Sequence, residues 1–142
     1  MYSALLEAKK GLLAGETPVG AVIVLDGKII AQSHNKTKLQ CDPTAHAEII
    51  ALRSAAIYLN TIYLTHCDLY VTLEPCHMCA HAISLARIRR LYFGAYDEKS
   101  GGIENGAHIY HSKSTHHKPE YYGGVRSNEA SALMKDFFSN KR

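Results

Sequence analysis

Two cysteines and two histidines lie close together in the stretch TLEPCHMCAH, which begins at Thr72. If this stretch opens a helix, Cys76 and Cys79 lie about 60° apart on one face, because an α-helix turns about 100° per residue. The two sulfurs can then bind one ion, and a helix N-terminus favours the thiolate form that binds metals. His77 and His81 point about 110° and 170° away from the midpoint between the sulfurs, so we do not expect them to join the site.

A third ligand is needed, because structural zinc sites use four protein ligands and catalytic sites use three plus a position for water. The best candidate is His46 in the sequence TAHAEIIAL, two residues before Glu48. Zinc held by one nitrogen and two sulfurs keeps a fourth position for water, whose pKa it lowers toward neutrality. A carboxylate that does not bind the metal, here Glu48, can move a proton from that water to a leaving group. Such a site would hydrolyse a bond at an electrophilic carbon.

The spacing of His46 and Glu48 does not establish this site by itself. On an ideal helix the two side chains point about 200° apart, so both reach one ion only if the helix is approached nearly end-on. A Cys-x-x-Cys pair can also be a redox pair or half of a zinc knuckle, but a redox pair leaves Glu48 without a role and no second pair exists. Cys41 and Cys67 stand alone and are expected to be ordinary side chains.

Turn residues and hydrophobic periodicity predict the elements that carry these side chains. An opening helix is expected between Ser3 as its N-cap and Gly15 just past its end. Asp26 and Gly27, between two β-branched runs, predict a β-hairpin. Four further elements, in the order helix, strand, helix and strand, are predicted over residues 43–58, 68–73, 75–87 and 90–95. The first of these helices takes Asp42 as its N-cap, with a proline at the first helical position.

The segment from Lys99 to Val125 shows little periodicity and is expected to be a long functional loop with a short strand near His108–Tyr110. Its histidines match no standard ligand spacing and are expected to be a polar loop rather than a second metal site. A last helix begins at Ser127. Together these elements predict a three-layer α/β/α domain around a mixed five-stranded sheet.

Bulk properties favour a soluble cytoplasmic protein of one domain, residues 1–142. No signal peptide or membrane-spanning run is expected. The net charge of +3 permits a polyanionic partner without requiring one. Basic and aromatic side chains near the C-terminus could contact phosphates and unpaired bases, although Phe137 and Phe138 could equally be core residues of the last helix. These side chains are Lys113, Lys118, Tyr121, Tyr122, Arg126, Lys135, Phe137, Phe138, Lys141 and Arg142.

The sequence HAE at residues 46–48 followed by PCxxC at residues 75–79 resembles the signature of the zinc-dependent nucleobase deaminases. The stretches PVGAVIV, DPTAHAEI, LYVTLEPCxMC and FGAYD extend this likeness. Over about residues 16–142 the chain resembles the bacterial tRNA adenosine deaminases of the zinc-dependent cytidine/deoxycytidylate deaminase family. The segment 101–125 matches poorly, so no RNA contact is carried over there.

The resemblance implies a cytidine-deaminase-like fold and hydrolysis of the wobble adenosine to inosine in the anticodon loop of a tRNA, with an arginine tRNA expected. It implies that one zinc ion (Zn2+) per subunit is bound by His46, Cys76 and Cys79. Glu48 would shuttle protons during attack on adenine C6. Asn35 would hydrogen-bond the flipped base, and Asp97 would lie against the backbone beside it. A homodimer that binds tRNA and no membrane is also implied.

Two other functions stay open at this stage. One is a zinc deaminase of a free nucleobase or nucleotide, of the cytosine, guanine or dCMP type. The other is a catalytically silent binding module that keeps zinc for folding.

Overall fold

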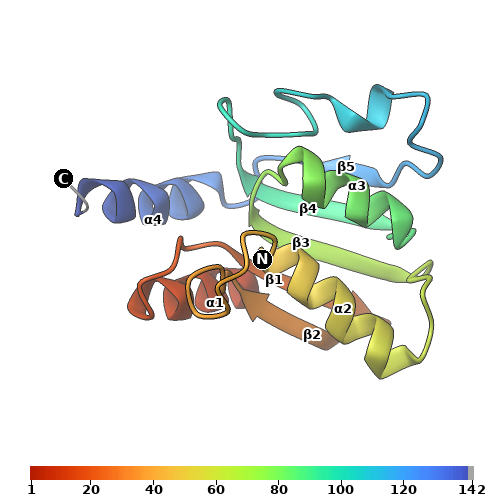
Figure 1. Cartoon of the computed structure of the whole chain (residues 1–142), viewed down its shortest axis with the longest axis horizontal. Coiled ribbons are helices and arrows are strands. Elements are labelled where there is room, and N and C mark those ends of the chain that lie inside the picture. The colour runs from red at the N-terminus through yellow and green to blue at the C-terminus, as the bar shows by residue number, and fades with distance from the viewer. Residues whose placement is uncertain (141–142) are drawn as a thin grey trace.

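The computed structural model describes residues 1–140, which form a five-stranded sheet with helices on both faces (Figure 1). In chain order the elements are α1 (Tyr2–Leu13), β1 (Gly20–Leu25), β2 (Lys28–His34), α2 (Ala47–Leu59), β3 (Cys67–Leu73), α3 (His77–Leu85), β4 (Arg90–Ala95), the 3₁₀-helix η1 (Ile109–His111), β5 (Glu120–Tyr122) and α4 (Ser127–Ser139). The strand order is β2-β1-β3-β4-β5. Strand β1 is antiparallel to both neighbours, whereas β3, β4 and β5 run parallel, which confirms the predicted mixed sheet.

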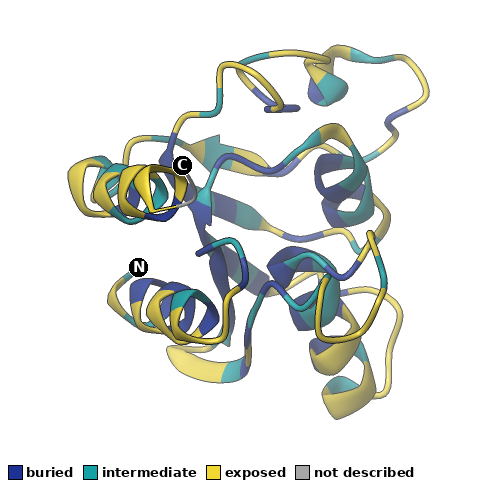
Figure 2. Ribbon diagram, turned by 60° about the vertical axis from the view of Figure 1, so that its left-hand side comes forward, coloured by how far each residue is buried: buried dark blue, intermediate teal, exposed yellow. Residues whose placement is uncertain are grey.

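The layers follow from the two helix pairs. Helices α2 and α3 cover one face of the sheet, and α1 and α4 cover the other, as the views in Figure 1 and Figure 2 both show. Buried residues gather on the strands and on the helix sides that face them (Figure 2). The predicted three-layer α/β/α arrangement is therefore confirmed. Within residues 1–140, no helix has the length and hydrophobicity of a membrane span.

Of the local features predicted near the start of the chain, the hairpin turn and the end of the first helix are confirmed and the helix N-cap is not. Asp26 and Gly27 both have positive φ values, 50° and 76°, which identifies the predicted hairpin turn as type I′. Gly15 has φ 81° directly after the C-cap of α1, where its amide hydrogen and that of Glu16 donate back into the last turn, as in a Schellman motif. The predicted N-cap at Ser3 is wrong, because α1 already begins at Tyr2.

Helix α2 begins later than the sequence predicts. Asp42 does not cap it, because Oδ1 of Asp42 accepts hydrogen bonds from the backbone N–H and the hydroxyl of Thr44. This local turn competes with helix formation, as Asp side chains often do. The helix starts at Ala47, with His46 as an extended N-cap residue at φ −73° and ψ 152°. Similarly, α3 begins at His77 rather than at the predicted proline.

The segment after β4 also differs from its prediction. The expected strand near His108–Tyr110 is wrong, since η1 lies there and the strand is β5 instead. Pairing partners determine such a short strand: Tyr122 lies opposite Tyr92 on β4, and the two rings stack with centroids 5.3 Å apart. Cross-strand contacts of this kind stabilise a strand whose own sequence carries little signal.

Glu16 organises the loop between β2 and α2. Its buried carboxylate accepts hydrogen bonds from the backbone N–H groups of Lys38 and Leu39 and from the hydroxyl of Thr37. Burial by itself would raise the pKa of Glu16, but these hydrogen bonds outweigh it and hold the pKa below its ordinary value of 4.5. The ionised carboxylate therefore fixes the loop that leads to His46.

We expect Glu16→Gln to lower the free energy of unfolding at pH 7 by about 1–3 kcal/mol, because buried amide donors lose their acceptor. The folded-state pKa is depressed, so this contribution is present above pH 4.5 and is lost as the pH falls through the folded-state pKa. Urea unfolding of both proteins should show the stability difference shrinking between pH 7 and pH 3. A difference that stays constant with pH would contradict this account.

Candidate metal centre

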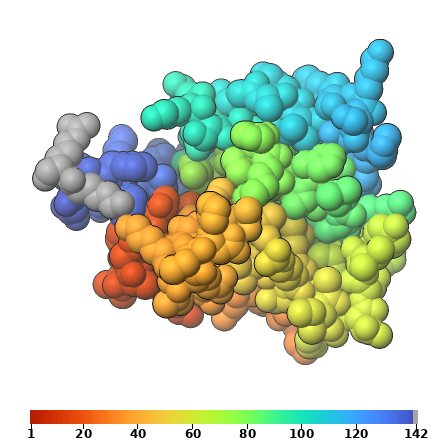
Figure 3. Space-filling view, viewed as in Figure 1, coloured from red at the N-terminus to blue at the C-terminus, as the bar shows by residue number. Residues whose placement is uncertain are grey.

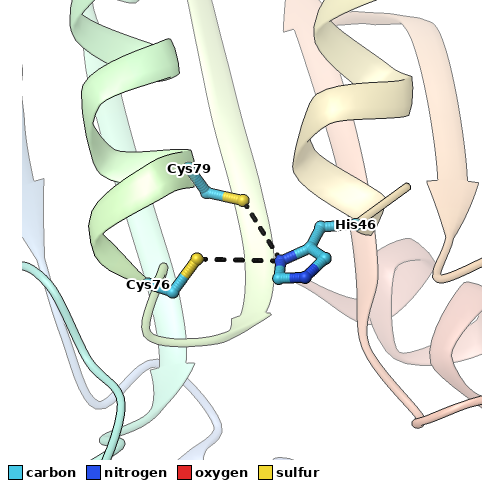
Figure 4. Close-up of side chains that lie close together, drawn as sticks. All are labelled: His46, Cys76 and Cys79. Atoms are coloured by element: carbon cyan, nitrogen blue, oxygen red, sulfur yellow. Dashed lines mark hydrogen bonds between the residues drawn. The ribbon is translucent and has the colours of Figure 1, made fainter. Parts of the chain in front are cut away.

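The N-termini of α2 and α3 meet at one point on the molecule. His46 is the N-cap residue of α2, Cys76 is the N-cap residue of α3, and Cys79 lies in the first turn of α3. Figure 4 shows both sulfurs pointing at the imidazole across the gap between the two helices. Strand β3 positions the two cysteines beside His46, because α3 begins shortly after the carboxyl end of this strand.

The three side chains have the spacing of a metal site. The sulfurs of Cys76 and Cys79 lie 3.7 and 3.5 Å from Nδ1 of His46, and one ligand atom from each residue lies within 4.8 Å of the others. Zinc bonds of about 2.3 Å to sulfur and about 2.0–2.1 Å to nitrogen put the two atoms about 3.6 Å apart in a tetrahedral site. Both sulfur–nitrogen distances are therefore compatible with a zinc ion.

The difficulty that the sequence raised for His46 and Glu48 is removed by the late start of α2. His46 has extended backbone angles and lies before the helix, so the angle between two positions of an ideal helix does not apply to it. Glu48 lies in the first turn, and both side chains line one cavity of about 220 Å³. The cavity walls are Thr17, Val19, Asn35, His46, Glu48, Leu73, Glu74, Cys76, Asp97 and Ser100.

The other histidines stay outside this group. His77 is exposed, and His81 lines a different hollow beside α3. Within residues 1–140, the group of His46 and the two cysteines is the one cluster of three metal-binding side chains. Within the described residues, the histidines after residue 100 belong to no such cluster.

Hydrogen bonds change the pKa values of the two thiols. The hydrogen bond from the Cys79 thiol lowers the pKa of Cys76 to about 4, and the neighbouring His46 adds to this effect. The same hydrogen bond, together with burial, raises the pKa of Cys79, which retains its proton. The pKa of His46 is raised, chiefly by its hydrogen bond to Cys76. These contacts thus favour the thiolate form of Cys76, the form that binds metals.

Two buried glutamates line the cavity, and their surroundings are opposite. Burial raises the pKa of Glu48, whose side chain is 4% exposed. Burial acts in the same direction on Glu74, but hydrogen bonds from Asn105 and from backbone amides outweigh it and lower the pKa of Glu74. Carboxyl groups whose environments separate their pKa values in this way have different roles. Of the two, Glu48 is the carboxyl whose protonated form burial favours.

Asn35 and Asp97 both line the cavity. Oδ1 of Asn35 accepts a hydrogen bond from the backbone N–H of Ala47 at 2.9 Å, which ties the end of β2 to the start of α2. The Nδ2 group of Asn35 has no hydrogen-bond partner within residues 1–140 and is available to a ligand. Oδ1 of Asp97 accepts from the backbone N–H groups of Lys99 and Ser100 and so shapes the turn after β4.

Sequence reasoning missed Glu74. It belongs to the same TLEPC stretch as the cysteines, yet the sequence alone gave it no role. A signal was present in Gly101, Gly102 and Asn105, small or polar residues that let a loop approach a carboxylate closely. Because these residues lie more than 25 positions after Glu74, their contact with its carboxylate could not be predicted from local sequence.

Comparisons with known proteins agree with this geometry. The family model described as MafB19-like deaminase matches residues 1–142. A protein of Agrobacterium fabrum named tRNA-specific adenosine deaminase is 49% identical over 142 residues, which are 100% of this chain and 93% of that protein. A protein of the same name from Aquifex aeolicus is 47% identical over 98% of this chain and 91% of its own length.

A solved structure gives the same result in three dimensions. It comes from biochemical and structural studies of A-to-I editing by tRNA:A34 deaminases at the wobble position of transfer RNA. It superposes with a TM-score of 0.92 at 49% identity and covers 94% of this chain and 96% of its own.

We expect Cys76→Ala to abolish stoichiometric metal binding and to lower the melting temperature, because metal ligation contributes to folding free energy. Elemental analysis of the purified protein and thermal unfolding measure both effects. His77→Ala, an exposed neighbour in the same stretch, is the matched control and should keep its metal. Stoichiometric zinc in the Cys76 variant would show that the ligand assignment is wrong.

Proposed function

The chain belongs to the MafB19-like deaminase family, and from this premise we propose that it is a zinc-dependent hydrolase that converts the wobble adenosine of a tRNA anticodon to inosine. The whole chain, residues 1–142, would act as one deaminase domain, with an arginine tRNA as the expected substrate. Relatives that share 47–49% of their residues with it and are named tRNA-specific adenosine deaminase support this substrate over a free nucleobase.

The observation that carries the proposal is the composition of one cavity. It joins a buried carboxyl, Glu48, whose pKa is raised, to a zinc-compatible group and to a free amide on Asn35. Its volume of about 220 Å³ lies below the range of about 300–1,000 Å³ that is typical of pockets for drug-sized ligands. A cavity of this size suits a single nucleobase, while the rest of a large substrate stays outside.

A zinc ion held by His46, Cys76 and Cys79 would supply a Lewis acid that makes water acidic near neutral pH. Glu48 takes a proton from the attacking water and passes it to the departing amino group, the role that a glutamate outside the ligand set has in zinc deaminases generally. A C–O bond forms at C6 of adenine and the C–N bond to the amino group breaks. Adenosine and water therefore give inosine and ammonia.

Asn35 and Asp97 would hold the base and its backbone. The Nδ2 of Asn35 can donate to an acceptor on the purine, while its Oδ1 stays bonded to the start of α2. Asp97 lines the same cavity together with Ser100, and we propose that it lies against the nucleotide backbone beside the base. A base in an anticodon loop is already unpaired, so moving it into the cavity costs less than flipping it out of a duplex.

We also propose that the enzyme is a cytoplasmic homodimer, as the family resemblance implies. Support comes from an apolar groove of about 600 Å³ between α2 and α3, on the face turned to the viewer in Figure 3. Its lining includes Leu85 and Ile62, which are 65% and 73% exposed. Such a concentration of exposed apolar side chains is typical of protein–protein contacts.

We expect the purified protein to convert adenosine to inosine in total tRNA, read as guanosine after reverse transcription and confined to position 34. Glu48→Gln should reduce the rate by at least about 100-fold, because the proton shuttle is lost. Zinc content and salt-dependent tRNA binding should persist in that variant. Ammonia release from free cytosine or guanine with no change in tRNA would instead support the small-molecule deaminase.

The dimer proposal predicts that Leu85→Arg shifts the protein toward the monomer, because a charge would be buried in the groove. Light scattering coupled to size-exclusion chromatography measures the mass directly. Leu13→Arg is the matched control: Leu13 is 90% exposed at the end of α1, in the opposite layer, and its substitution should leave the dimer intact. A monomeric wild-type chain would refute the proposal.

A further inference from the structure

The Glu74 carboxylate collects hydrogen bonds from one loop. Its Oε1 accepts from the backbone N–H of Asp97 at 3.1 Å and from Nδ2 of Asn105 at 2.7 Å. Its Oε2 accepts from the backbone N–H groups of Ile103, Glu104 and Asn105, at 3.1, 2.9 and 3.1 Å. The side chain is 2% exposed, and a carboxylate offers only about four lone-pair sites. Glu74 is therefore saturated by donors and has no capacity left for proton transfer.

The loop that it holds, residues 97–105, is called the clamp loop here. The clamp loop packs on the backbone at the start of α3 (teal, passing above α3 in Figure 1). The N–H of Gly102 donates to the carbonyl of Pro75 at 2.8 Å, and Gly101 forms an isolated bridge with Cys76. A Cβ on Gly102 would lie 2.6 Å from the backbone nitrogen of His77 and 2.7 Å from the carbonyl carbon of Cys76. Only glycine allows so close an approach.

The same clamp loop supplies one wall of the cavity. Asp97 and Ser100 both line it, and the backbone of Asp97 is bonded to Glu74 itself. Glu74 is in turn fixed to the sheet, since its N–H donates to the carbonyl of Ala95 at 2.8 Å. Glu74 is thus bonded to the sheet through its backbone and to the clamp loop through its carboxylate, and the clamp loop in turn contacts Cys76 and lines the cavity.

We propose that Glu74 is a positioning residue, whose carboxylate holds the clamp loop against the start of α3 and thereby fixes both the Cys76 ligand and the cavity wall at Asp97. For its effect on catalysis the proposal rests on the proposed function, but for its effect on metal binding it rests on the contacts alone. Groups that orient metal ligands in this way typically contribute about 10–100-fold in metal affinity.

Glu74→Gln is the sharpest test, because it keeps the shape and reverses the hydrogen bonding on one side. A glutamine has one oxygen, so its NH2 group must face either the Asp97 and Asn105 donors or the three backbone donors. Glu7→Gln is the matched control. Glu7 is also a buried carboxylate, but it pairs with Lys10 and His34 beside α1, in the opposite layer from α3.

Zinc affinity is measured by competition with a chromogenic chelator in the absence of RNA, alongside urea unfolding and the KM and kcat for tRNA. We expect Glu74→Gln to bind zinc about 10–100-fold more weakly and to raise KM. Glu7→Gln should lose stability while zinc affinity and KM stay at wild-type values. Wild-type zinc affinity in a folded Glu74→Gln protein, or an equal loss in both variants, would overturn the proposal.

If Glu74→Gln does not fold, Gly102→Ala tests the same contact from the other side. The added Cβ pushes the clamp loop away from Cys76 and leaves the carboxylate in place, so zinc affinity should again fall by about tenfold or more. Unchanged zinc affinity in that variant refutes the proposal.

The two proposals fail separately. Weak zinc binding in these variants with no action of the wild type on tRNA refutes the proposed function alone. Inosine formation by the wild type with unchanged zinc binding in the variants refutes the positioning role alone.

Discussion

The site depends on the convergence of two helix N-termini. His46 and Cys76 each occupy the extended position immediately before a helix, so both side chains project from a helix end rather than from its flank. At the N-terminus of each helix, unpaired backbone amides and the helix dipole favour anionic groups. The sulfurs of Cys76 and Cys79 and the carboxylate of Glu48 lie at these two N-termini. The packing of α2 against α3 on one face of the sheet therefore decides whether the three ligands meet.

Buried glutamates show how environment assigns different roles to one residue type. Glu16 and Glu74 each accept several hydrogen bonds from a loop, and these hydrogen bonds favour the ionised carboxylate. Glu48 is buried without such a set of donors, and its pKa rises. Two carboxylates thus stabilise loops next to the cavity, and the third, Glu48, lines the cavity with a raised pKa.

The elements around the sheet also have different roles. The parallel strands β3 and β4 end at the cavity, where β3 continues into the cysteine helix and β4 into the clamp loop. Helices α1 and α4 cover the opposite face, where Gly20 and Gly94 allow close contact with Ala4 and Ala130. The outer surface of α2 and α3 is left apolar and open, which is consistent with a partner chain.

Much of the fold and of the candidate site could be read from the chain. The Asp26-Gly27 turn, the strand Arg90–Ala95 and the start of the last helix at Ser127 follow from local signals, because turn chemistry and hydrophobic periodicity act over a few neighbouring residues. The Cys-x-x-Cys spacing likewise predicted two side chains of the candidate metal site. Tertiary structure alone decided the rest: the late start of α2 that lets His46 and Glu48 share a cavity, the position of β5, and the role of Glu74. Each of these features depends on contacts between residues that are distant along the chain. Such contacts form only when the layers pack, so local sequence patterns do not predict them.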